Sequence, residues 1–198
     1  MSRGRHEHRA DFDHFVAQST GGLLRTAFLV TGDVGLAEDL VQESLFKVAR
    51  RWSRVRAMDS PGAYARRIVV NLALDGSKRR SRHRAELAGQ ESAARPEAVP
   101  GASQSETSWS AFSAVDQRIE LLHALTALAP RQRAALVLRY FDDLSEAEVA
   151  SMLRCSIGTV KSTTSRALDK MRALVPARDE PVPEVSVLAT PQRKAAQP

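Results

Sequence analysis

Two side chains with nucleic-acid chemistry, Tyr64 and Asn71, are seven residues apart in an arginine-rich stretch. On a helix that rises about 1.5 Å per residue they share one face, about 10.5 Å apart. A tyrosine ring can stack on an unpaired base, and a carboxamide can read a base edge. With Arg67, Arg79 and Arg80 nearby, the pattern predicts a site for single-stranded nucleic acid. A half-buried core role for Tyr64 is the alternative.

A second group of donors lies on a predicted helix that begins after Ser156. With Val160 at the centre of its buried face, short donors and cations occupy the opposite face: Thr159, Lys161, Ser162, Ser165, Arg166 and Asp169. Such a face suits the major groove of duplex DNA. We include Ser156 and Lys170 in this candidate DNA-binding set. An ordinary helical hairpin with a polar outer face is the alternative.

A third candidate surface combines an aromatic ring with acidic and amide groups. Asp39, Gln42, Glu43 and Phe46 point away from the apolar stripe of a predicted helix over residues 34–52. An exposed aromatic residue among polar groups is a plausible anchor for a protein partner. Periodicity alone is equally consistent with a chance exposed phenylalanine.

Charge is sorted along the chain. The formal net charge of the 198 residues is +6, but residues 44–85 hold twelve Lys or Arg and only two Asp. Residues 11–43 and 86–129 are acidic. This sorting favours a polyanionic partner for the basic stretch, against the alternative of a solvated helix face.

Helical periodicity organises the first half of the chain. Apolar residues recur from Phe12 to Val30, until Thr31, Gly32 and Asp33 interrupt the pattern. A stripe of the next helix follows at spacings of three or four: Ala37, Val41, Leu45, Val48 and Trp52. Ser60 as N-cap and Pro61 at the first helical position predict the start of a third helix.

The second half contains a predicted helix-turn-helix. A helix should start at Pro130, and Ser145 with Glu148 forms a capping box that starts the next one. A short turn at residues 154–156 then leads into the helix capped by Ser156. Two helices joined by three or four residues are typical of this DNA-binding motif.

The fold class is therefore all-α, with two small helical domains. We place them at residues 11–85 and 118–175, joined by a flexible linker over residues 86–117 that is poor in large apolar residues. The tail over residues 176–198 carries five prolines, so we expect it to be disordered.

Composition excludes several classes of chemistry. Cys155 is the single cysteine, and five scattered histidines form no metal-binding spacing, so we expect no disulfide, metal or cofactor. No phosphate loop, nucleophile with a base, or matched pair of carboxylates points to an enzyme. Without an apolar signal or membrane segment, we expect a cytoplasmic protein.

These residues resemble the bacterial RNA polymerase sigma factors, specifically the extracytoplasmic-function (ECF) group. The resemblance covers AEDLVQESLFKVARRW at 37–52, AYARRIVVNLALD at 63–75 and LAPRQRAALVLRYFDDLSEAEVASMLRCSIGTVKSTTSRALDKMR at 128–172. The motifs TGD, VVNLALD and KSTTSRAL are similar to an actinobacterial subgroup. The chain departs from the family pattern at Arg154, where glycine is usual, and at Thr163, where many relatives carry arginine.

The resemblance implies a specificity subunit that binds core RNA polymerase, directs it to promoters and promotes DNA melting. It implies that Asp39, Gln42, Glu43 and Phe46 bind core polymerase. The minus-ten element would be read by Tyr64, Arg67, Asn71, Arg79 and Arg80, and the minus-thirty-five element by Ser156, Thr159, Lys161, Ser162, Ser165, Arg166 and Lys170. Further implied partners are promoter DNA, duplex and single-stranded, and an anti-sigma factor.

The rival interpretation is a stand-alone helix-turn-helix regulator that binds duplex DNA as a symmetric dimer. It requires a dimer interface and gives the Asp39, Gln42, Glu43 and Phe46 surface no role. The sigma-factor interpretation predicts instead that the free protein is a monomer with weak, salt-dependent affinity for duplex DNA.

Overall fold

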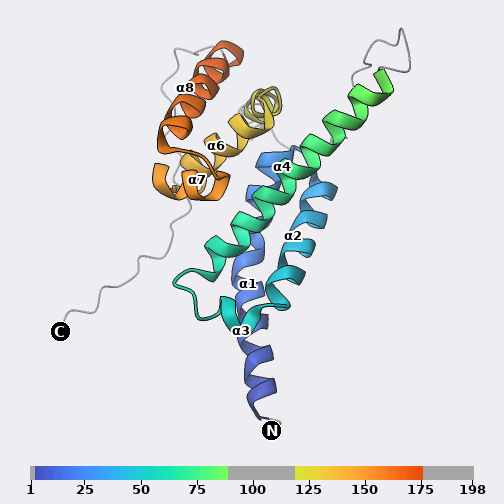
Figure 1. The fold of residues 1–198 in the computed structure, drawn as a ribbon, viewed down its shortest axis with the longest axis vertical. Coiled ribbons are helices and arrows are strands. Elements are labelled where there is room, and N and C mark those ends of the chain that lie inside the picture. The colour runs from blue at the N-terminus through green and yellow to red at the C-terminus, as the bar shows by residue number, and fades with distance from the viewer. Residues whose placement is uncertain (1–2, 89–118, 176–198) are drawn as a thin grey trace, which may run out of the picture.

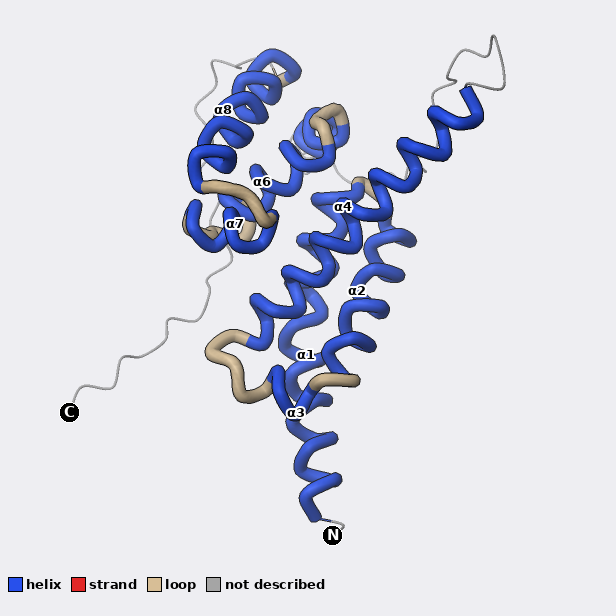
Figure 2. The backbone as a smooth tube through the Cα atoms, viewed as in Figure 1, coloured by secondary structure: helices blue, strands red, loops and turns tan. Residues whose placement is uncertain are grey.

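The computed structural model describes residues 3–88 and 119–175. The helices are α1 (Arg3–Thr31), α2 (Val34–Ala49), α3 (Trp52–Val55), α4 (Pro61–Ala88), a helix over residues 119–126, α6 (Pro130–Tyr140), α7 (Glu146–Leu153) and α8 (Ile157–Leu174). No strand occurs in these two ranges, so the all-α prediction is confirmed (Figure 2). Residues 89–117 of the predicted linker and all of the predicted tail over residues 176–198 lie outside the described residues.

The first domain is a bundle of α1, α2 and α4 (Figure 1). Its core contains small and branched side chains that let the helices approach closely, such as Ala27, Val48 and Val69, each fully buried. At one end, the Trp52 ring packs against Phe12 and Phe15, with ring centroids 5.3 and 5.0 Å away. Burial of these aromatic rings holds α3 against α1.

The boundaries of the first helices follow local signals, with one exception. Gly32, at φ 75°, ends α1, and the Asp33 carboxylate caps α2 by accepting from the backbone N–H of Leu36 at 2.9 Å. The prediction of one helix over residues 34–52 is wrong, because α2 ends at Ala49 and Trp52 begins α3. The turn between them directs the indole toward the two phenylalanines of α1.

Helix α4 begins as the sequence predicts and continues further than expected. The Ser60 hydroxyl accepts from the Ala63 backbone N–H at 3.2 Å, which fixes the start at Pro61. The helix then runs to Ala88, beyond residue 85, where we placed the end of the first domain. Alanine, arginine and glutamate are strong helix formers, so the helix continues without packing against the bundle.

The second domain contains the predicted helix-turn-helix. The Ser145 hydroxyl accepts from the Glu148 N–H at 3.2 Å, and the Glu148 carboxylate accepts from the Ser145 N–H at 2.7 Å, which completes the capping box. The Ser145 hydroxyl also donates to the Glu148 carboxylate at 2.6 Å, and this hydrogen bond, together with the one from the Ser145 N–H, lowers the pKa of Glu148. Ser156 caps α8 by accepting from the Thr159 N–H at 3.1 Å.

Arg154 makes the turn between α7 and α8 without the glycine that is usual there. It adopts a left-handed conformation, with φ 51° and ψ 56°, and its N–H still donates to the Ala150 carbonyl. A non-glycine residue in the left-handed region destabilises the fold by about 1–2 kcal/mol. The packing of the helices on both sides of the turn offsets this cost. The turn of the helix-turn-helix therefore forms with an arginine at this position.

We expect Arg154→Gly to stabilise the second domain by about 0.5–1 kcal/mol. Glycine relieves the left-handed strain, and part of that gain is offset by its greater backbone freedom in the unfolded chain. Thermal and urea unfolding measure the change. Arg154→Ala is the matched control, because alanine removes the same side chain but keeps the strain. Equal stabilisation by both variants would contradict this account.

The two domains share one core. The cluster that contains Val70 and Leu74 of α4 also contains Leu125, Leu138 and Val149 of the second domain. Helix α6 packs against α1, and α6 and α7 both contact α4, so the second domain lies alongside the bundle (Figure 1). Among the described residues, no helix has the length and apolar character needed to cross a membrane.

Candidate nucleic-acid interface

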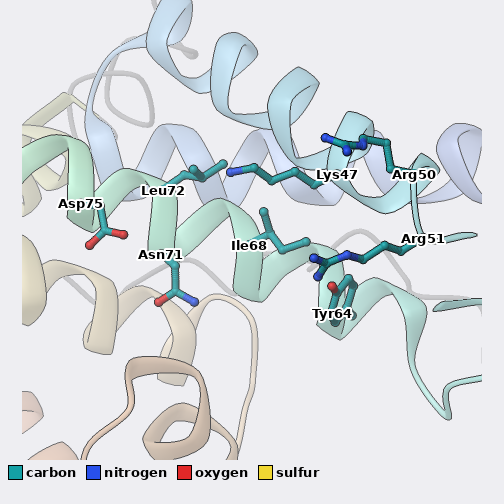
Figure 3. Close-up of a pocket in the computed structure, with 8 residues that line it drawn as sticks. All are labelled: Lys47, Arg50, Arg51, Tyr64, Ile68, Asn71, Leu72 and Asp75. Atoms are coloured by element: carbon teal, nitrogen blue, oxygen red, sulfur yellow. The ribbon is translucent and has the colours of Figure 1, made fainter. Parts of the chain in front are cut away.

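A hollow between the end of α2 and the middle of α4 brings together cations, a tyrosine ring and a carboxamide. Lys47, Arg50 and Arg51 lie on one side, and α4 contributes Tyr64, Ile68, Asn71, Leu72 and Asp75 (Figure 3). Helix α4 places Tyr64 and Asn71 on the same face, as their spacing predicts. The hollow therefore combines two apolar side chains, polar groups along α4 and three cations from the end of α2 and the turn after it.

The carboxamide of Asn71 in this hollow is available to a ligand. The Asn71 side chain makes no hydrogen bond within the described part of the chain, so its carboxamide can both donate and accept. Tyr64 is half-buried and packs against the core of the bundle, as the core interpretation predicts, and it also lines the hollow. Its burial fixes the ring, and a fixed ring next to cations suits a stacked base with its phosphates.

The predicted site is only partly assembled. Arg67 is half-buried on the neighbouring face of α4, outside the hollow. Arg79 and Arg80 lie further along α4 and line a different depression with Arg82 and His83. The hollow itself contains three cations that the motif analysis did not select: Lys47, Arg50 and Arg51. The charge excess of residues 44–85 was the signal for them, but spacing could not show that the end of α2 lies beside α4.

The α8 surface is close to the prediction. Thr159, Lys161, Ser162, Ser165 and Arg166 are all exposed, while Val160, Thr164 and Met171 face the core. Ser156 is also exposed but serves as the N-cap of α8. Lys170 differs from the others, because its ammonium donates to the Ala127 carbonyl at 2.7 Å. That contact holds Lys170 at the flank of the helix.

The candidate protein-binding face of α2 is open. Phe46 is 64% exposed, and Asp39, Gln42 and Glu43 are exposed beside it. The Arg50 guanidinium lies 5.9 Å from the centre of the Phe46 ring, and Glu43 pairs with Lys47 at 2.8 Å. The face thus offers an apolar ring surrounded by charges of both signs.

Comparison with known proteins identifies the family. Residues 15–83 match the family model described as Sigma-70 region 2, and residues 118–171 match the one described as Sigma-70, region 4. The RNA polymerase sigma-E factor of Streptomyces coelicolor is 31% identical over 172 residues, which cover 85% of this chain and 88% of the relative. The chain belongs to the RNA polymerase sigma factors.

The relatives place this sigma factor in the ECF group, as the motifs predict. The ECF RNA polymerase sigma factor SigE of Mycolicibacterium smegmatis is 31% identical over 163 residues, which cover 81% of this chain and 60% of the relative. The solved sigma factor RpoE of Bartonella quintana shares the fold, with a TM-score of 0.61, 24% identity and coverage of 83% of this chain and 96% of that one. A sigma factor directs core RNA polymerase to promoters, so the stand-alone regulator is not favoured.

Proposed function

We propose that three surfaces divide the work of this sigma factor. The α2 face around Phe46 binds core polymerase, the hollow between α2 and α4 captures unpaired bases of the minus-ten element, and the exposed face of α8 reads the minus-thirty-five element as duplex. Each surface has the chemistry that its task requires. The α2 face offers an exposed aromatic anchor, and the hollow offers a rigid ring and an amide beside cations. The α8 face offers short donors and cations on a recognition helix.

The observation that carries this proposal is the composition of the hollow. Tyr64 and Asn71 line the hollow together with Lys47, Arg50 and Arg51. Groups that can bind a base therefore lie in the same hollow as groups that can bind phosphate. Opening duplex DNA costs a few kcal/mol per unstacked step. A surface that binds exposed bases offsets the cost of unstacking at sequences whose bases it prefers. DNA melting by this means requires no catalytic group in the sigma factor.

Run-off transcription with purified core polymerase on a genomic fragment library tests the proposal. We expect defined transcripts only when the sigma factor and core polymerase are both present. The promoters recovered should share two short elements. Specific binding of a promoter by the free protein as a dimer would support the stand-alone regulator instead, and size-exclusion chromatography with and without core polymerase separates these cases.

We expect Lys161→Ala with Arg166→Ala to abolish minus-thirty-five recognition while leaving polymerase association near wild type. Each lost base or phosphate contact costs about 1–3 kcal/mol. Footprinting of the reconstituted holoenzyme measures this effect. Lys170→Ala is the matched control on the same helix, because its ammonium is engaged at Ala127. Unchanged protection of the upstream element by the double variant would exclude this face of α8.

The remaining partners follow from the family. We propose that the free sigma factor is monomeric and that an anti-sigma factor regulates it in the cell. The Bartonella quintana sigma factor RpoE was solved in complex with the anti-sigma factor NepR. Co-purification from the native organism, with the Phe46 face intact or substituted, would identify such a partner.

A further inference from the structure

A single carboxylate lies among the cations of the helix-turn-helix. Helices α6, α7 and α8 line a second hollow, which contains Arg139, Lys161 and Arg172, and Glu146 is the one acid among the described residues that line it. Glu146 is the first residue of α7, the first helix of the motif. It lies outside the candidate DNA-binding set, whose members all belong to α8 or cap it.

The Glu146 carboxylate pairs with Lys161 of α8. Its Oε2 lies 3.6 Å from the Lys161 Nζ, and the two side chains are 37% and 64% exposed. Ion pairs at such exposed positions contribute little to stability. The start of α7 is already capped, because Ser145 and Glu148 form the capping box. Glu146 therefore contributes little to holding the fold, which leaves its charge free for another role.

Lys161 lies where a recognition helix meets the bases. In a helix-turn-helix, the N-terminal residues of the second helix contact base edges in the major groove. Lys161 is the fifth residue of α8, in its second turn, and its side chain is exposed. Because the Glu146 carboxylate lies 3.6 Å from this ammonium, both groups face the same part of the groove.

A carboxylate at this position disfavours most DNA sequences. It is repelled by the phosphates, so it weakens binding to any site that offers it no hydrogen-bond donor. The donors of the major groove are the amino groups at cytosine N4 and adenine N6. Glutamate typically accepts from cytosine N4, and lysine typically donates to guanine O6 and N7. The paired charges of Glu146 and Lys161 are therefore complementary to a G·C base pair.

We propose that Glu146 is a specificity-determining residue, which together with Lys161 selects a G·C base pair within the minus-thirty-five element. The Lys161 ammonium donates to guanine, and the Glu146 carboxylate accepts from the N4 amino group of its cytosine partner. In the free chain the two groups pair with each other, which keeps them side by side. The inference rests on the proposed function, because it requires that the exposed face of α8 reads this element.

Transcription from a promoter library tests the proposal. The templates carry a randomised minus-thirty-five element and a barcode in the transcript, and the holoenzyme is reconstituted from the full chain and core polymerase. We expect the wild type to prefer G·C at one position of the element. Glu146→Ala should lower that preference about tenfold and leave the other positions unchanged. Wild-type base preference at every position in this variant would overturn the proposal.

Glutamine at the same position provides a second variant that keeps the length of the side chain. A glutamine carboxamide matches the N6 and N7 groups of adenine. We therefore expect Glu146→Gln to change the preferred base pair at that one position from G·C to A·T.

Asp143→Asn is the matched control for the loss of a negative charge. Asp143 is exposed, lies three residues before Glu146 and does not line the hollow. Asparagine tolerates the φ of 51° at this position, and thermal unfolding checks that all variants are folded. If Asp143→Asn and Glu146→Gln change transcription equally and uniformly across the library, Glu146 acts only through net charge and the proposal is wrong.

Lys161→Ala with Arg166→Ala separates failure of the inference from failure of the proposed function. Loss of selectivity in this double variant, with wild-type preferences in both Glu146 variants, would exclude Glu146 but keep α8 as the reader of the element. Wild-type preferences in the double variant as well would show that another surface reads the minus-thirty-five element.

Discussion

Replacing Glu43 and Phe46 together by alanine is expected to abolish association with core polymerase while the fold stays intact. Phe46 is 64% exposed, so its ring contributes little to the core of the bundle. Glu43 pairs with the exposed Lys47, and such surface pairs contribute little to stability. Loss of an aromatic anchor and its charged neighbour typically removes several kcal/mol from a protein interface.

Pull-down with core polymerase measures this loss, and thermal unfolding checks the fold. Val34→Ala with Glu38→Ala is the matched control, since it removes an exposed apolar residue and an exposed acid nearer the start of α2, about two turns before Phe46. Duplex DNA binding through α8 should survive in both double variants. Wild-type polymerase association in the Glu43 and Phe46 variant would show that the polymerase contacts another surface.

Asn71→Ala and Tyr64→Ala are expected to slow promoter opening far more than they weaken polymerase association. Each removes one partner of an unpaired base, and a stacked base is worth about 1–3 kcal/mol, or about 5- to 150-fold in rate or equilibrium. A template melted in advance should rescue the variants only in part, because the strand must still be held open.

Opening kinetics followed by permanganate reactivity or a fluorescent base measure this effect. Ser81→Ala is a control on the same helix, because Ser81 is exposed and lies outside the hollow. Tyr64 also packs against the core, so the stability of Tyr64→Ala must be measured alongside. Wild-type kinetics in both variants would leave Tyr64 as a core residue and Asn71 as an ordinary surface residue.

The sequence predicts those parts of the molecule that depend on neighbouring residues. The capping box at Ser145, the start of α4 at Pro61 and the exposed face of α8 each follow from residues within one or two helical turns. Trp52 shows the limit of this reasoning. Its spacing fits the α2 stripe, but contacts with Phe12 and Phe15, about forty residues earlier, place it in a separate helix.

The rest of the site depends on contacts between distant segments. Lys47 and Asn71 line one hollow only because α2 packs against α4, and no short-range pattern encodes that arrangement. The pairing of Thr26 with Asp142 joins residues 116 positions apart. From the sequence alone, Asp142 appears as an ordinary charged residue of a DNA-binding domain, and only the packed structure shows its contact with α1.

The shared core makes the two domains genetically interdependent. Leu125 is 1% exposed and lies in the same cluster as Val70 and Leu74 of α4. A truncation of Leu125 would loosen support for the helix that carries Asn71, although Leu125 belongs to the domain assigned to the upstream element. Substitutions that impair minus-ten use should therefore map to both halves of the gene, and compensating changes for one half can arise in the other.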